Sequence, residues 1–132
     1  MAVLDKAAAP HGNAGSIVIL CAEEATRAAL AYWTTQLPVH FVIADDGYHA
    51  NRILRTEACR LLLTDRLLPP WPGLDSFRQL RERNPGLRIA VVEGPRREDA
   101  GLARVTGATD ILARPLRRQA VADTIDAATR PS

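Results

Sequence analysis

Five short apolar runs recur along this chain of 132 residues, and each is followed by a longer, more polar segment. The first run, residues 16–22, is continuous and rich in β-branched side chains, which is typical of a strand buried on both faces. Further strands are predicted at 39–44, 60–65, 87–93 and 109–113. Helices are predicted at 23–37, 48–58, 74–83, 97–107 and 116–130. Strands separated by helices of this length build a parallel sheet with helices on both faces, so we expect an α/β domain.

The predicted helices carry apolar stripes at helical spacing, and these stripes identify the residues that we expect to face the sheet. In the first two helices the expected inward-facing residues are Thr26, Leu30, Trp33 and Leu37, then Ala50, Ile53 and Leu54. In the third and the last helices they are Leu74, Phe77 and Leu80, then Leu116, Ala120, Val121, Ile125 and Ala128.

The composition fits one domain with one core, because 47% of the residues are apolar and the length leaves no room for a second domain. We expect residues 1–15, a mixture of small residues with Pro, Gly and Asn, to be a flexible leader before a folded unit at 16–129. No apolar run approaches the about 20 residues that span a bilayer, and the N-terminus lacks the apolar centre of a signal peptide. A soluble cytoplasmic protein without membrane contact is therefore expected. A net charge of +2 gives little reason to expect direct binding of nucleic acid.

In a parallel α/β sheet, ligands bind beyond the carboxyl ends of the strands, so the residues that end each strand are the candidates for function. The first strand ends in Cys21 and Ala22, and Glu23 and Glu24 follow; the later strands end in or before Asp65, Glu93 and Arg114. Cys21 is interpreted as a small core residue rather than a thiol sensor. Because Cys59 begins the third strand, the two cysteines are predicted at opposite ends of the sheet, where a disulfide cannot form.

Three segments together resemble the CheY-like receiver domain of bacterial response regulators, over about residues 16–128. The segment "LLLTDRLLPPWPGL" is similar to the one in which the third strand of a receiver ends in the phosphate-accepting aspartate; Asp65, Leu68, Pro69 and Gly73 are in register with it. "ADDG" at 44–47 resembles the turn after the second strand, and "GATDILARPL" resembles the segment around the fifth. The resemblance implies a flavodoxin-like (βα)5 fold, a doubly wound five-stranded parallel sheet in strand order 2-1-3-4-5.

The resemblance also implies which positions should carry the chemistry of a receiver. In the family, two acidic residues after the first strand join the acceptor aspartate in holding Mg²⁺. A Thr or Ser after the fourth strand and a Lys after the fifth bind the phosphoryl oxygens. The cation and the ammonium offset the repulsion between a phosphoryl group and a cluster of carboxylates.

Only the acceptor, Asp65, matches this pattern in residue type. Cys21 and Ala22 occupy the positions of the acidic pair, Glu93 that of the hydroxyl and Arg114 that of the lysine; Ile111 replaces the aromatic switch residue. We therefore expect weak Mg²⁺ binding at most, and no bound cofactor. We also predict that Arg114 makes a bidentate pair with the carboxylate of Asp65 or Glu93, which would hold the site in one state.

Three hypotheses about function follow. The first is a signalling domain, not an enzyme, with an atypical phosphorylation site and an action through protein contacts. The second is a working receiver, phosphorylated on Asp65 by a histidine kinase and using Glu23 or Glu24 for Mg²⁺. The third is a small flavodoxin-like enzyme or nucleotide binder, which the glycine-free turn "CAEEATRA" disfavours.

The expected partners are proteins. The resemblance implies a histidine kinase or a downstream signalling protein, and also a homodimer formed through the fifth strand and the last helix. Arg114, Arg117 and Arg118 make that region basic, but no aromatic platform or DNA-binding motif accompanies the charge.

Overall fold

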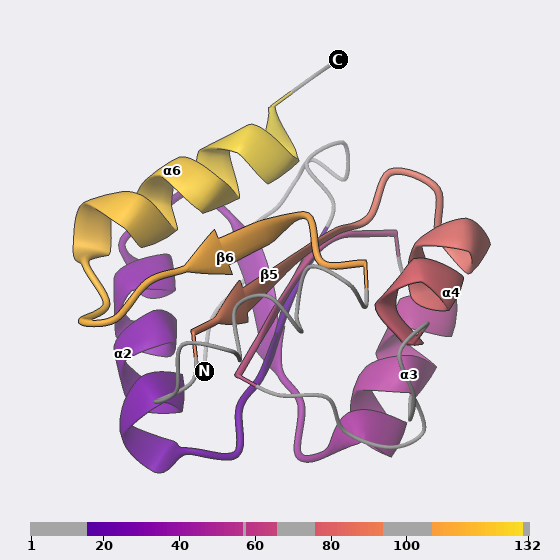
Figure 1. The fold of residues 1–132 in the computed structure, drawn as a ribbon, viewed down its shortest axis with the longest axis horizontal. Coiled ribbons are helices and arrows are strands. Elements are labelled where there is room, and N and C mark those ends of the chain that lie inside the picture. The colour runs from indigo at the N-terminus through magenta and orange to yellow at the C-terminus, as the bar shows by residue number, and fades with distance from the viewer. Residues whose placement is uncertain (1–15, 57, 66–75, 94–106, 131–132) are drawn as a thin grey trace.

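A computed structural model describes residues 16–56, 58–65, 76–93 and 107–130, and these form a single parallel sheet with helices on both faces (Figure 1). The strands are β2 (Ser16–Leu20), β3 (His40–Ile43), β4 (Cys59–Thr64), β5 (Arg88–Val92) and β6 (Asp110–Leu112). They lie in the order β3-β2-β4-β5-β6, and every neighbouring pair is parallel. This is the predicted order 2-1-3-4-5, which is confirmed together with the flavodoxin-like fold.

The helices divide between the two faces of the sheet, as Figure 1 shows. The first pair is α2 (Glu24–Thr35) and α6 (Arg118–Thr129), and the second pair is α3 (Gly47–Thr56) and α4 (Ser76–Arg83). Alternating strand residues point to the two pairs: Ile17 and Ile19 pack with α2 and α6, whereas Val18 packs with α3 and α4. All five residues of β2 are buried, so the prediction of a strand covered on both faces is confirmed.

The predicted helix stripes are mostly confirmed, with one error and one omission. Ala50, Ile53 and Leu54 of α3 are buried as expected. In α6, however, Ala120 is exposed, because it lies one residue from the buried stripe and therefore about 100° around the helix from it. In α2 the stripe also includes Thr34, which was not predicted; its buried hydroxyl donates to the Leu30 carbonyl at 2.6 Å.

Several predictions lie outside the described residues. These are the leader at 1–15, the inward-facing position of Leu74, most of the helix at 97–107, and the match of Leu68, Pro69 and Gly73 to the receiver segment. Among the helices that the structure describes, none is long and apolar enough to cross a membrane.

Candidate functional site

The carboxyl ends of β2 and β4 meet side by side, and this brings Asp65 to the turn that leads into α2. Leu20 is in register with Thr64, so the residues that follow the two strands are neighbours. The carboxylate of Asp65 accepts a hydrogen bond from the N–H of Ala22, 3.1 Å from each oxygen, and one from the N–H of Glu23 at 2.9 Å. Asp65 therefore faces the positive end of α2, where backbone N–H groups lack helical partners.

Arg114 bridges the loops after β2 and β5. Its Nη2 lies 3.1 Å from Oε1 of Glu23 and 3.4 Å from the hydroxyl of Thr26, and its Nε donates to the Glu93 carbonyl at 2.7 Å. The predicted bidentate pair with the carboxylate of Asp65 or Glu93 is wrong. The carboxylate of Asp65 instead accepts hydrogen bonds from backbone N–H groups, and the guanidinium of Arg114 pairs with the carboxylate of Glu23.

Glu93 continues directly from β5 and is partly buried beside the loop that carries Arg114. Its N–H donates to the Leu112 carbonyl at 2.8 Å, which extends the ladder between β5 and β6. One oxygen of its carboxylate accepts a long hydrogen bond, 3.4 Å, from the backbone N–H of Arg114. Glu93 and Arg114 thus hold each other through backbone groups as well as side chains.

Cys21 is a buried thiol at the centre of this edge, with 5% of its surface exposed. Burial, and after it the negative charge of Asp65, raise the pKa of the Cys21 thiol to about 12, although the positive charges of Arg27 and Arg114 act in the opposite direction. Arg27 also donates to the Cys21 carbonyl at 3.1 Å. At neutral pH the thiol is therefore protonated, which agrees with its interpretation as a core residue.

Glu23 and Glu24 differ in their surroundings although they are adjacent. Glu23 accepts hydrogen bonds from the hydroxyl of Thr26 and from Arg114, whereas Glu24 is exposed and begins α2. Within the described ranges, no group of three or more His, Cys, Asp or Glu side chains is placed to hold a metal ion.

Sequence reasoning did not assign Thr26 and Arg27 to this site. Both belong to the first turn of α2, and Thr26 was placed in its apolar stripe. The available signal was spacing: Thr26 and Arg27 are three and four residues after Glu23, on the same side of a helix.

Comparison with known proteins agrees with this fold. The response regulator receiver domain family matches residues 17–126, which is most of the chain. A search of curated proteins finds no match. Among solved structures, the signal receiver domain of an HD domain-containing protein from Pseudomonas fluorescens is 17% identical, with a TM-score of 0.71 and coverage of 86% of this chain and 92% of that one.

Two further structures share the fold at similar identity. NtrX from Brucella abortus is 21% identical with a TM-score of 0.73, over 87% of this chain and 26% of NtrX. The receiver domain of Ssk1 from Saccharomyces cerevisiae, crystallised with the histidine phosphotransfer protein Ypd1, is 18% identical with a TM-score of 0.69, over 86% and 88%. The chain is an α/β domain with a flavodoxin-like sheet and a strand-end aspartate beside a helix N-terminus. The chain belongs to the response regulator receiver domain family of two-component signalling.

Proposed function

We propose that this receiver domain has an atypical phosphorylation site and signals through protein contacts rather than through phosphorylation of Asp65. The observation that carries the proposal is the bridge from Arg114 to Glu23, with a separation of 3.1 Å. In a working receiver the cation after the last strand binds the incoming phosphoryl group. Here that cation is engaged by a carboxylate of the same molecule.

The contacts of Asp65 support the same proposal. Its two oxygens accept three hydrogen bonds of 2.9–3.1 Å from backbone N–H groups. Phosphorylation would replace this carboxylate with a larger, more negative group beside Glu23 and Glu93. The residues at the acidic-pair positions supply no carboxylate that could hold a metal ion and so offset that charge.

The residues at those positions also fit Mg²⁺ poorly. Mg²⁺ requires oxygen ligands in near-octahedral geometry. Cys21 offers a buried, protonated thiol, Ala22 offers no ligand, and the carboxylate of Glu23 is paired with Arg114. The proposed action through protein contacts therefore does not depend on a metal ion.

The partner that we propose is a protein. The Ssk1 receiver was crystallised with a histidine phosphotransfer protein, and a histidine kinase or a downstream signalling protein is the corresponding candidate here. A homodimer through β6 and α6 is a second possibility, and the exposed residues Arg118, Gln119 and Asp123 of α6 would lie near its interface.

The test is incubation of the protein with acetyl phosphate and Mg²⁺, followed by intact-mass analysis. We expect no stoichiometric phosphoryl adduct. A variant that combines Ala22→Asp, Glu93→Thr and Arg114→Lys restores three of the four replaced residue types and leaves the buried Cys21 in place. We expect it to gain an adduct that Asp65→Asn then removes.

The alternative is a working phospho-acceptor that uses Glu23 or Glu24 for Mg²⁺, and it is favoured by the partial exposure of Asp65. It predicts an adduct on the natural protein. It also predicts saturable Mg²⁺ binding, which can be measured by tryptophan fluorescence. This binding should disappear in the variant Asp65→Asn. Either result would overturn the proposal of an atypical site.

A further inference from the structure

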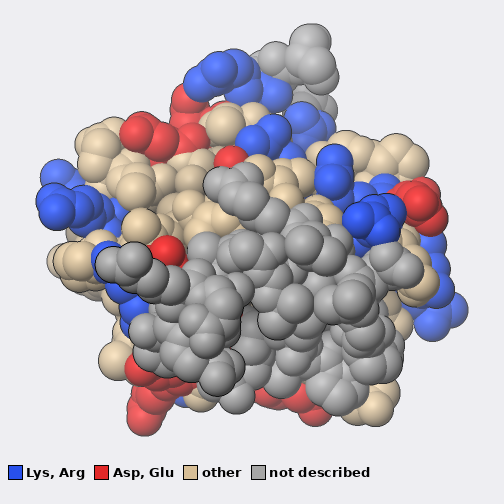
Figure 2. All heavy atoms as spheres, in the orientation of Figure 1, with Lys and Arg blue, Asp and Glu red and all other residues tan. Residues whose placement is uncertain are grey.

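The edge of the sheet opposite Asp65 contains an open depression of about 400 Å³ that is lined by four arginines. We call it the arginine pocket: Arg60, Arg81, Arg88 and Arg130 surround it, with Leu87 and Thr109 also in its wall. Arg60 belongs to β4, Arg88 begins β5, Arg81 belongs to α4 and Arg130 follows α6. In Figure 2, basic side chains lie at the upper, left and right parts of the molecule with some acidic ones among them, and further acidic side chains lie along the lower rim.

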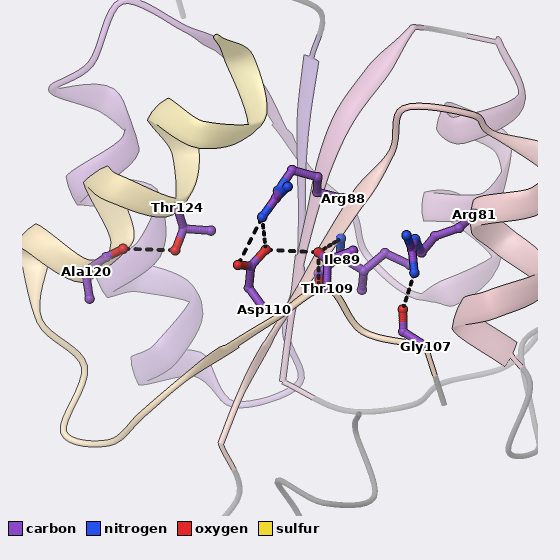
Figure 3. A network of polar contacts seen from close by, with 8 residues as sticks. All are labelled: Arg81, Arg88, Ile89, Gly107, Thr109, Asp110, Ala120 and Thr124. Atoms are coloured by element: carbon purple, nitrogen blue, oxygen red, sulfur yellow. Dashed lines mark hydrogen bonds and ion pairs between the residues drawn. The ribbon is translucent and has the colours of Figure 1, made fainter. Parts of the chain in front are cut away.

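Two of the four arginines are paired with carboxylates. Nη2 of Arg88 lies 3.0 and 3.1 Å from the two oxygens of Asp110, and Nη2 of Arg130 lies 2.6 Å from Asp126. Figure 3 shows the first pair, with Thr109 next to Asp110 and within 2.9 Å of its carboxylate. These two ion pairs balance the charges of Arg88 and Arg130.

The other two arginines contact only backbone carbonyls within the described part of the chain. Arg60 donates to the carbonyls of Ala128 and Arg130, at 3.2 and 3.4 Å. Arg81 donates to the Gly107 carbonyl at 3.2 Å, as Figure 3 shows. Backbone carbonyls carry only partial negative charge, so among the described residues no carboxylate balances the charges of Arg60 and Arg81.

The arginines of the pocket also have N–H donors that bond to no acceptor of the described residues. A guanidinium has five N–H donors, and Arg60 and Arg81 use only a few of theirs. Nε of Arg88 is buried and has no acceptor among the described residues. An anion in the pocket would provide acceptors that this part of the chain does not.

We propose that the arginine pocket binds a small organic phosphate through its phosphoryl dianion. A dianion matches the charges of Arg60 and Arg81, which no carboxylate of the described residues balances, and guanidinium groups bind phosphate oxygens bidentately. The volume of the depression lies within the range of pockets for small ligands, although it is more open to solvent than an enclosed pocket. Its wall contains no aromatic residue of the described chain on which a nucleic-acid base could stack, which favours a small molecule over a single strand.

The first experiment titrates inorganic pyrophosphate, as the probe, into the natural protein at constant ionic strength. We expect saturable binding by calorimetry, with a Kd on the order of 0.1–1 mM for a few charge-assisted hydrogen bonds. In two-dimensional NMR, the amide signals of Gly86, Leu87 and Thr109 should shift, whereas those of Ala22 and Glu23 should not. Shifts centred on Ala22 and Glu23 would place the anion at the Asp65 edge and overturn the proposal.

Matched variants separate a built site from general charge attraction. Arg81→Gln should weaken pyrophosphate binding by about tenfold, since it removes one charged donor. Arg52→Gln removes the same charge from an exposed position of α3 outside the pocket, and it should change the affinity by less than about twofold. An equal loss in both variants would mean that the pocket is not a site.

Three further results would also overturn the proposal. They are the absence of saturable binding up to about 10 mM, an equal affinity for sulfate, and tighter binding of single-stranded DNA or anionic vesicles than of pyrophosphate. The proposal does not depend on whether Asp65 is phosphorylated, because Asp65→Asn should leave the pyrophosphate affinity unchanged.

Discussion

Carboxylates accept hydrogen bonds from the backbone N–H groups of helix N-termini at the carboxyl edge of the sheet, whereas at the amino edge arginines donate to backbone carbonyls. Arg27 and Arg114 also donate to carbonyls at the carboxyl edge. Asp65 binds the N–H groups before α2, and Asp46 binds the N–H of His49 in the first turn of α3 at 2.8 Å. At the other edge, Arg60 binds the carbonyls at the end of α6.

The parallel topology explains this difference. Every strand of a parallel sheet runs the same way, so its carboxyl edge leads into helix N-termini and its amino edge follows helix C-termini. Helix N-termini carry unpaired N–H groups and partial positive charge, and C-termini carry carbonyls and partial negative charge. This favours carboxylates at helix N-termini and arginines at helix C-termini, although Asp110 lies at the amino edge and Arg27 and Arg114 lie at the carboxyl edge.

The start of α6 departs from this preference. Arg117 occupies its N-cap position without a side-chain capping bond, and Arg118 begins the helix. Arg114 lies just before them and is bound to Glu23 across the edge. Cations at a helix N-terminus are electrostatically unfavourable, so helix stability does not explain them.

The largest expected contrast between the edges is the reactivity of their two cysteines. A pKa of about 12 lowers the thiolate fraction of Cys21 at pH 8 by roughly a thousandfold relative to an ordinary thiol. With Ellman's reagent, the variant Cys59→Ser, which keeps Cys21, should therefore react far more slowly than Cys21→Ala, which keeps the partly buried Cys59.

The pH dependence of this reactivity has a definite sign. The rate for Cys21 should rise with pH throughout the range in which the protein is folded, because its pKa lies above that range. Since the unfolded thiol ionises first, this group should also lower the free energy of unfolding as the pH rises from about 9 towards 12. Rapid reaction of Cys21 at pH 8 would contradict the buried edge described above.

A glycine at the amino edge should give the second-largest effect. Gly107 has a φ of +105°, and a Cβ there would lie 2.6 Å from the backbone nitrogen of Arg78 in α4. Gly107→Ala should cost about 3 kcal/mol of unfolding free energy through backbone strain and collision. The matched control is Gly86→Ala, at a φ of +92° but with nothing within 4 Å of the new Cβ, which should cost about 1 kcal/mol. Equal midpoints in urea would show that α4 does not approach Gly107 so closely.

The helix cap at the carboxyl edge should give a smaller effect. Asp46→Ala removes the carboxylate that accepts from the N–H of His49, and it should cost about 1 kcal/mol of unfolding free energy. Asp45→Ala removes an adjacent, exposed carboxylate that does not cap the helix, and it should cost less than about 0.5 kcal/mol. Urea denaturation compares the two, and equal costs would show that general charge rather than capping stabilises this edge.

The sequence predicted the sheet and the position of Asp65 because both depend on local patterns. Continuous apolar runs identify the strands, and their alternation with helices sets the direction of every strand. Asp65 then lies at the carboxyl edge whatever its side chain contacts.

The partner of Arg114 could not be predicted in the same way. Which carboxylate it reaches depends on the path of the turn at Ala22 and Glu23, whose N–H groups bind Asp65 and leave the side chain of Glu23 for the arginine. The arginine pocket was missed for a related reason. Arg60 and Arg88 lie in or beside strands, and Arg81 and Arg130 at helix ends, so only the folded chain brings them together.

The smallest expected effect compares one arginine–carboxylate pair from each edge. Arg114 and Glu23 are 37% and 50% exposed, so a double-mutant cycle with glutamine at each position should give a coupling of about 0.5 kcal/mol. Arg88 and Asp110 are 39% and 29% exposed, and Nη2 of Arg88 contacts both carboxylate oxygens. The same cycle there should give about 1 kcal/mol, because a second hydrogen bond and a less exposed carboxylate strengthen the pair.

Both couplings should fall in high salt, and the Arg114 pair should lose the larger fraction of its coupling energy. A coupling near zero for Arg114 and Glu23 would mean that the bridge exerts no hold on the loop, so the proposal of an atypical site would then rest on the contacts of Asp65 alone.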